Sequence, residues 1–411
     1  MAEYQVYTFS NGIRLAHRQV MHTKIVHCGI MLDIGSRDES SSQTGLAHFW
    51  EHMAFKGTKK RKAYHIINKL EAVGGELNAY TTKEKICFYA SVLDLHFEKA
   101  VDILSDITFH SVFPTKQLEM ERSVILEEMA MYLDSPEDAI QDEFDELVFP
   151  NHPLGSNILG TKETVQNFSQ KDLEEFIHDN LDTENIVISI VGNINFKKAK
   201  RVVSKYISEI PSFKRSSKRL VAPVQPVITK KVEKPISQSH MTIGFPAFSL
   251  HHESKLKYFT LIHLLGGSGM NSRLNLALRE KNGLVYGIDA NFTAFSDTGY
   301  TTINFATDKK NLKKAENLIY KEITNLQKKP LGDLQLKRLQ DQLMGQLAMS
   351  DESNQSYMLM MAKSILDKNK VDSLEDIFNE IQSVTTSDIL ELAQTTLRLE
   401  EMSSLTYLSA N

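Results

Sequence analysis

The amino-acid sequence predicts an α+β protein with two domains, each a mainly antiparallel sheet packed by helices. Runs of β-branched residues with period-two alternation begin both halves of the chain, and helical periodicity follows in both. The apolar periodicity stops around Pro211, where small and basic residues take over. We therefore expect domains over residues 1–211 and 226–411, joined by a linker over residues 212–225.

In the first half, alternation predicts strands over residues 12–17 and 25–31, and the apolar run 187–194 predicts a central strand of the sheet. A period of 3.6 residues predicts helices over residues 63–73, 96–109, 116–133 and 171–180. Cys28 and Cys87 both lie in apolar, strand-like runs. Two cysteines in a chain of 411 residues argue against a disulfide framework, so we expect reduced core residues.

The second half repeats this succession of strands and helices. Strands are expected over residues 239–245 and 301–307, and we expect the latter to be the counterpart of the strand 187–194. The periodicity predicts helices over residues 254–265, 272–281, 312–327 and 332–349.

Composition excludes several classes of protein. A formal net charge of -5 leaves no basic excess for binding nucleic acid. The sequence contains no run of about eighteen apolar residues, so it predicts no membrane-spanning helix. The N-terminal residues lack a basic stretch followed by an apolar core, so a cytoplasmic location is the expectation.

The motif that carries chemistry is His48-Phe49-Trp50-Glu51-His52, an H-x-x-E-H sequence. On a helix, His48 and His52 share one face and can reach one cation, with Glu51 beside it. This order reverses the commoner H-E-x-x-H signature and is the mark of the inverzincins. The alternative is a chance match in which both histidines are ordinary helix residues.

The sequence around this motif, HFWEHMAFKGT from His48 to Thr58, resembles the M16 peptidases, the family of insulysin, pitrilysin and the mitochondrial processing peptidase. The resemblance extends along nearly the whole chain. It implies one Zn²⁺ per chain, with Glu128 as the third ligand after His48 and His52, and Glu121 as a supporting residue. Helix geometry agrees, because residues 121 and 128 are seven apart and share a face, whereas Glu127 is rotated by about a quarter turn.

The resemblance also implies residues that bind substrate. Asn78 and Ala79 match an edge strand that takes up the substrate backbone, although an ordinary hairpin strand is the alternative. Arg279 and Tyr286 match a run, following the glycine-rich turn at 266–269, that binds the substrate carbonyl near zinc. The alternative is that Arg279 caps a helix end and Tyr286 packs in a sheet.

From these residues and this resemblance we expect a zinc metalloendopeptidase that hydrolyses peptides or unfolded polypeptides in an enclosed chamber. Two histidines and one glutamate leave a fourth position for water, whose proton Glu51 can take. The resemblance implies that the chain forms half of a clamshell, so a homodimer is expected, with a heterodimer as the alternative.

Two other functions stay open: a non-catalytic or regulatory subunit of a heterodimeric peptidase, and a zinc hydrolase of small non-peptide substrates. Trp50 stands where the family has an aliphatic residue, so we expect it to affect helix packing or the shape of the pocket.

Overall fold

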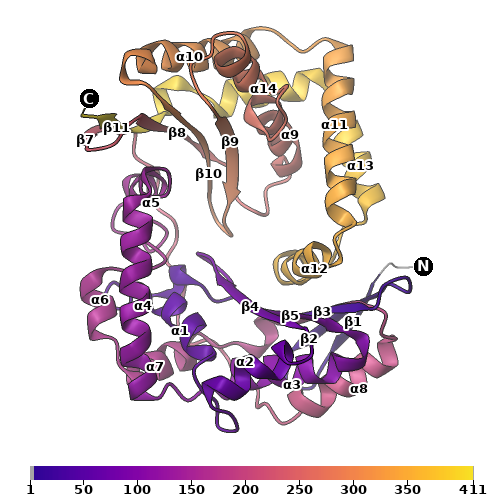
Figure 1. Ribbon diagram of the computed structural model, residues 1–411. Coiled ribbons are helices and arrows are strands. Elements are labelled where there is room, and N and C mark those ends of the chain that lie inside the picture. Colours follow the sequence, from indigo (N-terminus) through magenta and orange to yellow (C-terminus); the bar gives the residue numbers. More distant parts are fainter. Residues whose placement is uncertain (1–3, 411) are drawn as a thin grey trace. The chain divides into compact units, whose positions relative to one another are not determined.

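The computed structural model describes residues 4–410 and contains two compact units, each built on one sheet (Figure 1). The first unit comprises the residues up to Ala130 together with Ser156–Leu220 and Met349–Ser373. The second comprises Met131–Gly155, Val221–Ala348 and the residues from Leu374 onward. The predicted α+β class with two helix-packed sheets is confirmed.

The sheet of the first unit has six strands in the order β1-β2-β6-β3-β5-β4. The strands are β1 (Gln5–Thr8), β2 (Arg14–Gln19), β3 (Ile25–Leu32), β4 (Glu76–Thr81), β5 (Ile86–Leu93) and β6 (Ile186–Gly192). Only β2 and β6 are parallel neighbours. All seven residues of β6 are buried, which confirms the predicted central strand. Strand β4 lies at an edge.

The sheet of the second unit has five strands in the order β7-β11-β8-β10-β9. The strands are β7 (Thr229–Lys234), β8 (Ser239–Ala247), β9 (Ile288–Ala294), β10 (Gly299–Thr307) and β11 (Ser403–Ser409). Here β7 and β11 form the parallel pair, and the other neighbours are antiparallel.

The two sheets share one topology, and this corrects one prediction. In both, a parallel pair is followed by three antiparallel neighbours, so β6 corresponds to β11 and β5 corresponds to β10. The predicted counterpart of the strand 187–194, residues 301–307, was therefore wrong. The true counterpart is β11, near the end of the chain. In each unit the central strand follows, in sequence, the helices that come after the hairpin β4–β5 or β9–β10.

The α-helices are α1 (Leu46–Ala54), α2 (Ala63–Glu71), α3 (Phe97–Phe109), α4 (Thr115–Asp134), α5 (Pro136–Val148), α6 (Lys162–Asn167), α7 (Gln170–Asn180), α8 (Phe196–Ile207), α9 (Lys255–Gly266), α10 (Leu312–Lys328), α11 (Asp333–Asp351), α12 (Asn354–Lys368), α13 (Leu374–Ser383) and α14 (Thr386–Thr396). The α-helices for which the sequence predicted ranges, α2, α3, α4, α7, α9, α10 and α11, agree with those ranges to within a few residues at their ends, whereas α5, α6, α8, α12, α13 and α14 were not predicted. The predicted helix 272–281 contains a π-helical segment, η4 (Asn275–Glu280). No described helix has the length and apolar character needed to cross a bilayer.

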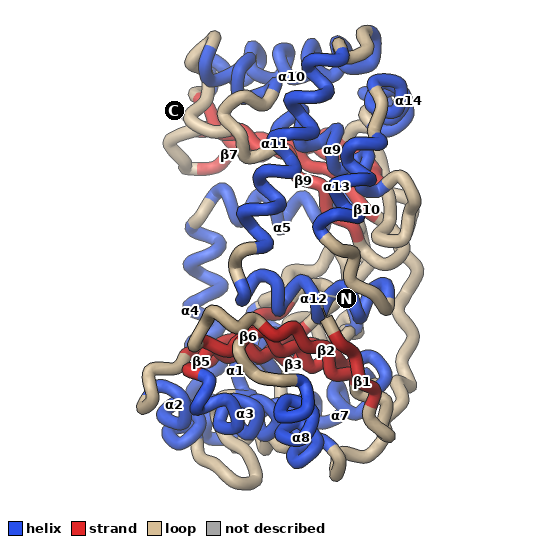
Figure 2. Tube along the Cα trace, turned by 90° about the vertical axis from the view of Figure 1, so that its right-hand side faces the viewer, coloured by secondary structure: helices blue, strands red, loops and turns tan. Residues whose placement is uncertain are grey.

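Each unit takes one helix from the other half of the sequence. Helix α12 packs against β3 and β6 of the first sheet, on the face opposite to α3 and α8 (Figure 2). Helix α5 packs in the same way against β8 and β11 of the second sheet. The structural units therefore do not follow the chain in order. The division of the sequence at residues 212–225 stays a prediction.

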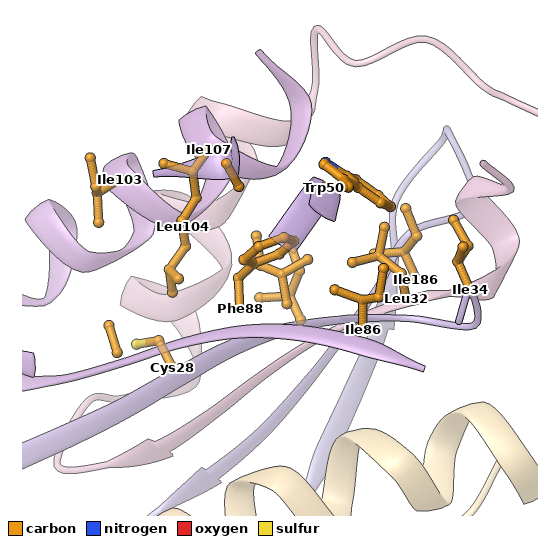
Figure 3. Close-up of a cluster of buried hydrophobic side chains, with 14 of the residues drawn as sticks. Cys28, Leu32, Ile34, Trp50, Ile86, Phe88, Ile103, Leu104, Ile107 and Ile186 are labelled. Carbon is orange, nitrogen blue, oxygen red and sulfur yellow. The ribbon is translucent and has the colours of Figure 1, made fainter. Parts of the chain in front are cut away.

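The core of the first unit lies between its sheet and α1, α3 and α7 (Figure 3). Trp50 of α1 packs among side chains of the strands, including Phe88 of β5. Cys28 belongs to this core, and Cys87 faces α12 on the other side of the sheet. Both thiols are free and buried, as predicted.

Candidate metal centre

Helix α1 positions the H-x-x-E-H motif, and its first turn is fixed by a buried carboxylate. Glu39 accepts hydrogen bonds from the backbone N–H of Gly45 at 2.9 Å and of Ala47 at 2.7 Å. These are donors that a helix leaves without partners at its N-terminus. Gly45 has φ +97°, and a Cβ there would lie 2.6 Å from the carbonyl oxygen of Leu159. Only glycine therefore fits at this entry to the helix.

The apolar face of α1 anchors the helix in the core. Phe49, Trp50 and Met53 are fully buried. The Trp50 ring makes edge contacts with Phe88 at 6.1 Å and with Phe176 at 6.5 Å between ring centroids. Trp50 therefore serves helix packing, one of the two effects expected for it, and its indole N–H has no acceptor among the described residues.

His48, His52 and Glu128 come together as a potential metal site. One ligand atom from each lies within 4.8 Å of the other two, and no other such group of His, Cys, Asp or Glu occurs among residues 4–410. Nε2 of His52 lies 3.5 Å from Oε2 of Glu128, and Nε2 of His48 lies 3.9 Å from Oε1. Ligands about 2.1 Å from a tetrahedral zinc are about 3.4 Å apart, so this donor set fits zinc with little adjustment.

Helix α4 supplies Glu128 and presents it correctly. Glu128 is half-buried on the side of the helix that carries the buried Glu121, whereas Glu127 is exposed to solvent. Because residues seven apart on a helix share a face, Glu128 and not Glu127 faces the histidines. The predicted choice between these two glutamates matches the geometry.

The neutral state of His48 and the hydrogen bond of His52 suit metal binding. Burial, followed by the proximity of His52, lowers the pKa of His48 to about 3. The imidazole of His48 is therefore neutral, as a ligand must be. Nδ1 of His52 lies 2.9 Å from Oε1 of Glu121, so the ring donates there and leaves Nε2 free to face Glu128.

Lys56 completes this support, although the sequence analysis did not identify it as a site residue. Its ammonium lies 2.5 Å from Oε2 of Glu121. Burial by itself would raise the pKa of Glu121, but the hydrogen bonds from His52 and Lys56 outweigh burial and lower this pKa. Glu121 therefore stays ionised and can accept from His52. Lys56 lies two residues beyond the end of α1, so the helical spacing of the motif did not identify it.

Glu51 lies beside the metal ligands and contacts the edge strand of the sheet. Its Oε2 accepts a hydrogen bond of 2.6 Å from the hydroxyl of Thr81, the last residue of β4. Burial raises the pKa of Glu51, the Thr81 hydrogen bond and His52 oppose this, and Glu128 adds to it. A carboxylate whose pKa is raised in this way is a better proton acceptor and donor near neutral pH.

Asn78 and Ala79 lie on the same strand, β4, which has a partner only on one side. The side-chain oxygen of Asn78 accepts from the backbone N–H of Ala79 at 2.8 Å. The edge is thus available for pairing with an extended segment. Whether it binds substrate stays a prediction.

Arg279 and Tyr286 belong to the second unit, where they lie close together. The Arg279 guanidinium carbon is 5.4 Å from the centroid of the Tyr286 ring. Tyr286 is 87% exposed, so the alternative that it packs in a sheet is wrong. The approach of this pair to the metal ligands stays a prediction.

Comparisons with known proteins agree with this geometry. The family model "Insulinase (Peptidase family M16)" matches residues 14–162, which contain the potential metal ligands, and "Peptidase M16 inactive domain" matches residues 167–343. An uncharacterised zinc protease of Bacillus subtilis, YmxG, is 34% identical over 94% of each chain. Another of Rickettsia felis is 30% identical over 95% of this chain and 94% of its own.

Solved structures share the fold at low sequence identity. A peptidase M16 inactive domain from Pseudomonas fluorescens superimposes with a TM-score of 0.92 at 18% identity, covering 99% of this chain and 98% of the other. A protease from Helicobacter pylori gives a TM-score of 0.90 at 19% identity, covering 99% of this chain and all of the other. The motif, the metal geometry and these relatives lead to one conclusion: the chain belongs to peptidase family M16.

Proposed function

We propose that this protein is a zinc-dependent endopeptidase acting on peptides or unfolded polypeptides. The observation that carries the proposal is the convergence of His48, His52 and Glu128 within ligand distance of one another, with Glu51 beside them. A set of three protein ligands leaves a fourth position open, which is typical of catalytic rather than structural zinc sites.

A zinc ion held by these ligands would polarise a peptide carbonyl and make water more acidic. Glu51 acts as the general base that accepts the proton from the attacking water, and it then donates this proton to the leaving amine. Glu121 keeps the ring of His52 in one tautomer and orientation, and Lys56 keeps Glu121 charged.

The edge of β4 takes up the substrate backbone as an added strand, with main-chain contacts at Asn78 and Ala79. The Asn78 side chain, which accepts from the Ala79 N–H, moves aside when substrate binds there. Arg279 and Tyr286 contact the substrate carbonyl as a further pair of donors. We propose an enclosed chamber formed by a homodimer, because one chain carries both the metal ligands and this pair.

A non-catalytic subunit is the second candidate, since residues 167–343 match a family model described as inactive. The potential metal ligands and Glu51 all lie outside that match, within residues 14–162. The complete ligand set therefore favours the peptidase.

The test is cleavage of a mixture of quenched fluorescent peptides by purified protein, before and after chelation and after zinc is restored. Glu51→Gln is assayed in parallel, together with zinc content. We expect cleavage that zinc restores, and at least about a 100-fold lower kcat in Glu51→Gln with its zinc retained. The proposal would be overturned if the wild-type protein binds zinc but cleaves no peptide, either alone or mixed with related chains that could serve as a partner subunit.

A further inference from the structure

We propose that Thr81 is a positioning residue for Glu51, and that it links the base to the strand on which substrate docks. This inference rests on the proposed peptidase function and adds a residue and a coupling to it. The observation behind it is the 2.6 Å hydrogen bond from the Thr81 hydroxyl to Oε2 of Glu51. It joins the last residue of β4 to the middle of α1.

This bond selects one orientation of the carboxylate. A glutamate side chain has three rotatable bonds, and holding it costs conformational entropy. With Oε2 engaged by Thr81, the other oxygen, Oε1, is the one left to exchange a proton. Hydrogen bonds to an ionised acceptor are short and strong, which agrees with the 2.6 Å distance.

The sheet register shows that the main-chain groups of Thr81 point toward the free edge of β4, where substrate is proposed to bind. The backbone N–H of Thr82 donates to the carbonyl of Lys85 at 2.8 Å, and Thr81 lies opposite Ile86. Hydrogen-bonded and non-hydrogen-bonded pairs alternate along an antiparallel ladder. Thr81 and Ala79 therefore direct their N–H and C=O groups away from β5, toward the free edge.

The Ala79 N–H, which bonds to the Asn78 side chain rather than to β5, agrees with this alternation. A peptide that adds to β4 would thus pair next to the residue whose side chain holds the base. The substrate backbone and the Glu51 carboxylate are placed by the same short piece of strand.

The turn that follows Thr81 is fixed by buried charges. Arg37 forms a 2.7 Å ion pair with Glu84, and Lys85 forms a 2.6 Å ion pair with Asp367. Glu84 and Lys85 are both buried. Breaking a buried pair is costly, so the end of β4 is held firmly and Thr81 is preorganised.

The experiment compares Thr81→Val with Thr81→Ser in the full-length protein, measuring kcat, KM and zinc content with one quenched peptide. Valine keeps the shape of threonine and removes the hydroxyl, and serine keeps the hydroxyl and removes a methyl group. We expect Thr81→Val to lower kcat by about 10- to 100-fold, with KM within about two-fold and zinc unchanged. Thr81→Ser should remain within about three-fold of the wild-type kcat.

The other possible outcomes contradict either the positioning role of Thr81 or the proposed peptidase function. A wild-type kcat in Thr81→Val, equal losses in the two variants, or loss of zinc in Thr81→Val would each overturn the positioning role and leave the peptidase standing. Wild-type protein without chelator-sensitive cleavage would instead overturn the proposed function, and this inference with it.

Discussion

Nδ1 of His52 lies 2.9 Å from Oε1 of Glu121, and the same carboxylate receives the ammonium of Lys56 on its other oxygen. The metal-facing histidine is thus held by a carboxylate that is itself held by a cation just beyond the C-terminal end of α1. Such outer partners tune ligand affinity.

Glu121→Gln should weaken zinc binding by about 10- to 100-fold, because the neutral amide no longer pairs with Lys56 or supports His52 as a charged acceptor. Competition against a chelator of known affinity measures the change. Glu119→Gln, on the exposed side of the same helix, is the matched control and should bind zinc as wild type does. Equal affinity in Glu121→Gln and wild type would show that the contact has no part in holding the metal.

Glu128→Gln should purify with most of its zinc lost, because it removes the charged ligand that lies 3.5 Å from Nε2 of His52. Its neighbour Glu127 is exposed, and Glu127→Gln should retain one zinc per chain. Elemental analysis of both variants tests the assignment. The reverse result would mean that helix α4 presents a different face to the histidines.

Gly45→Ala should lower the free energy of unfolding by at least about 2 kcal/mol, because φ +97° strains any residue with a Cβ and the added methyl would meet the Leu159 carbonyl. Gly345 lies within α11, and a Cβ there would meet no described atom within 4 Å. Gly345→Ala should therefore raise the free energy of unfolding by up to about 1 kcal/mol. Urea unfolding of both variants gives the comparison, and a loss in Gly345→Ala as large as that in Gly45→Ala would contradict it.

His17 should make the protein less stable in mild acid. The side chain is 3% exposed and its Nε2 donates to the carbonyl of Ile194 at 2.7 Å. Burial lowers the pKa of His17 below the ordinary value of 6.5, although the hydrogen bond to Ile194 opposes this. Below pH 6.5, His17 therefore takes up a proton in the unfolded chain more readily than in the folded protein. The free energy of unfolding should fall there by up to about 1.4 kcal/mol per pH unit for this group.

His17→Gln should reduce this slope between about pH 5 and 6.5, because the glutamine amide does not titrate. His178→Gln is the control, since the side chain of His178 is 80% exposed. Denaturant unfolding at several pH values measures both slopes. An unchanged slope in His17→Gln would contradict the prediction.

The sequence determined the local features of this protein. Period and composition predicted the strands β3 and β6 and the helix α4 close to their observed ends, because the strands are apolar runs buried along most of their length and the helix buries residues on one face. The spacing of His48, Glu51 and His52 predicted a metal-binding helix face, since helix geometry alone decides which side chains are neighbours.

Tertiary structure decided what depends on contacts between distant segments. The pairing of β11 with β7 and β8, the packing of α12 on the first sheet, and the bonds from Lys56 and Thr81 join residues whose sequence carries no sign of their partners. The local pattern says that a face is buried or a side chain is polar. Only the folded chain selects which of many chemically suitable partners meets it, because that choice depends on the packing of the whole unit.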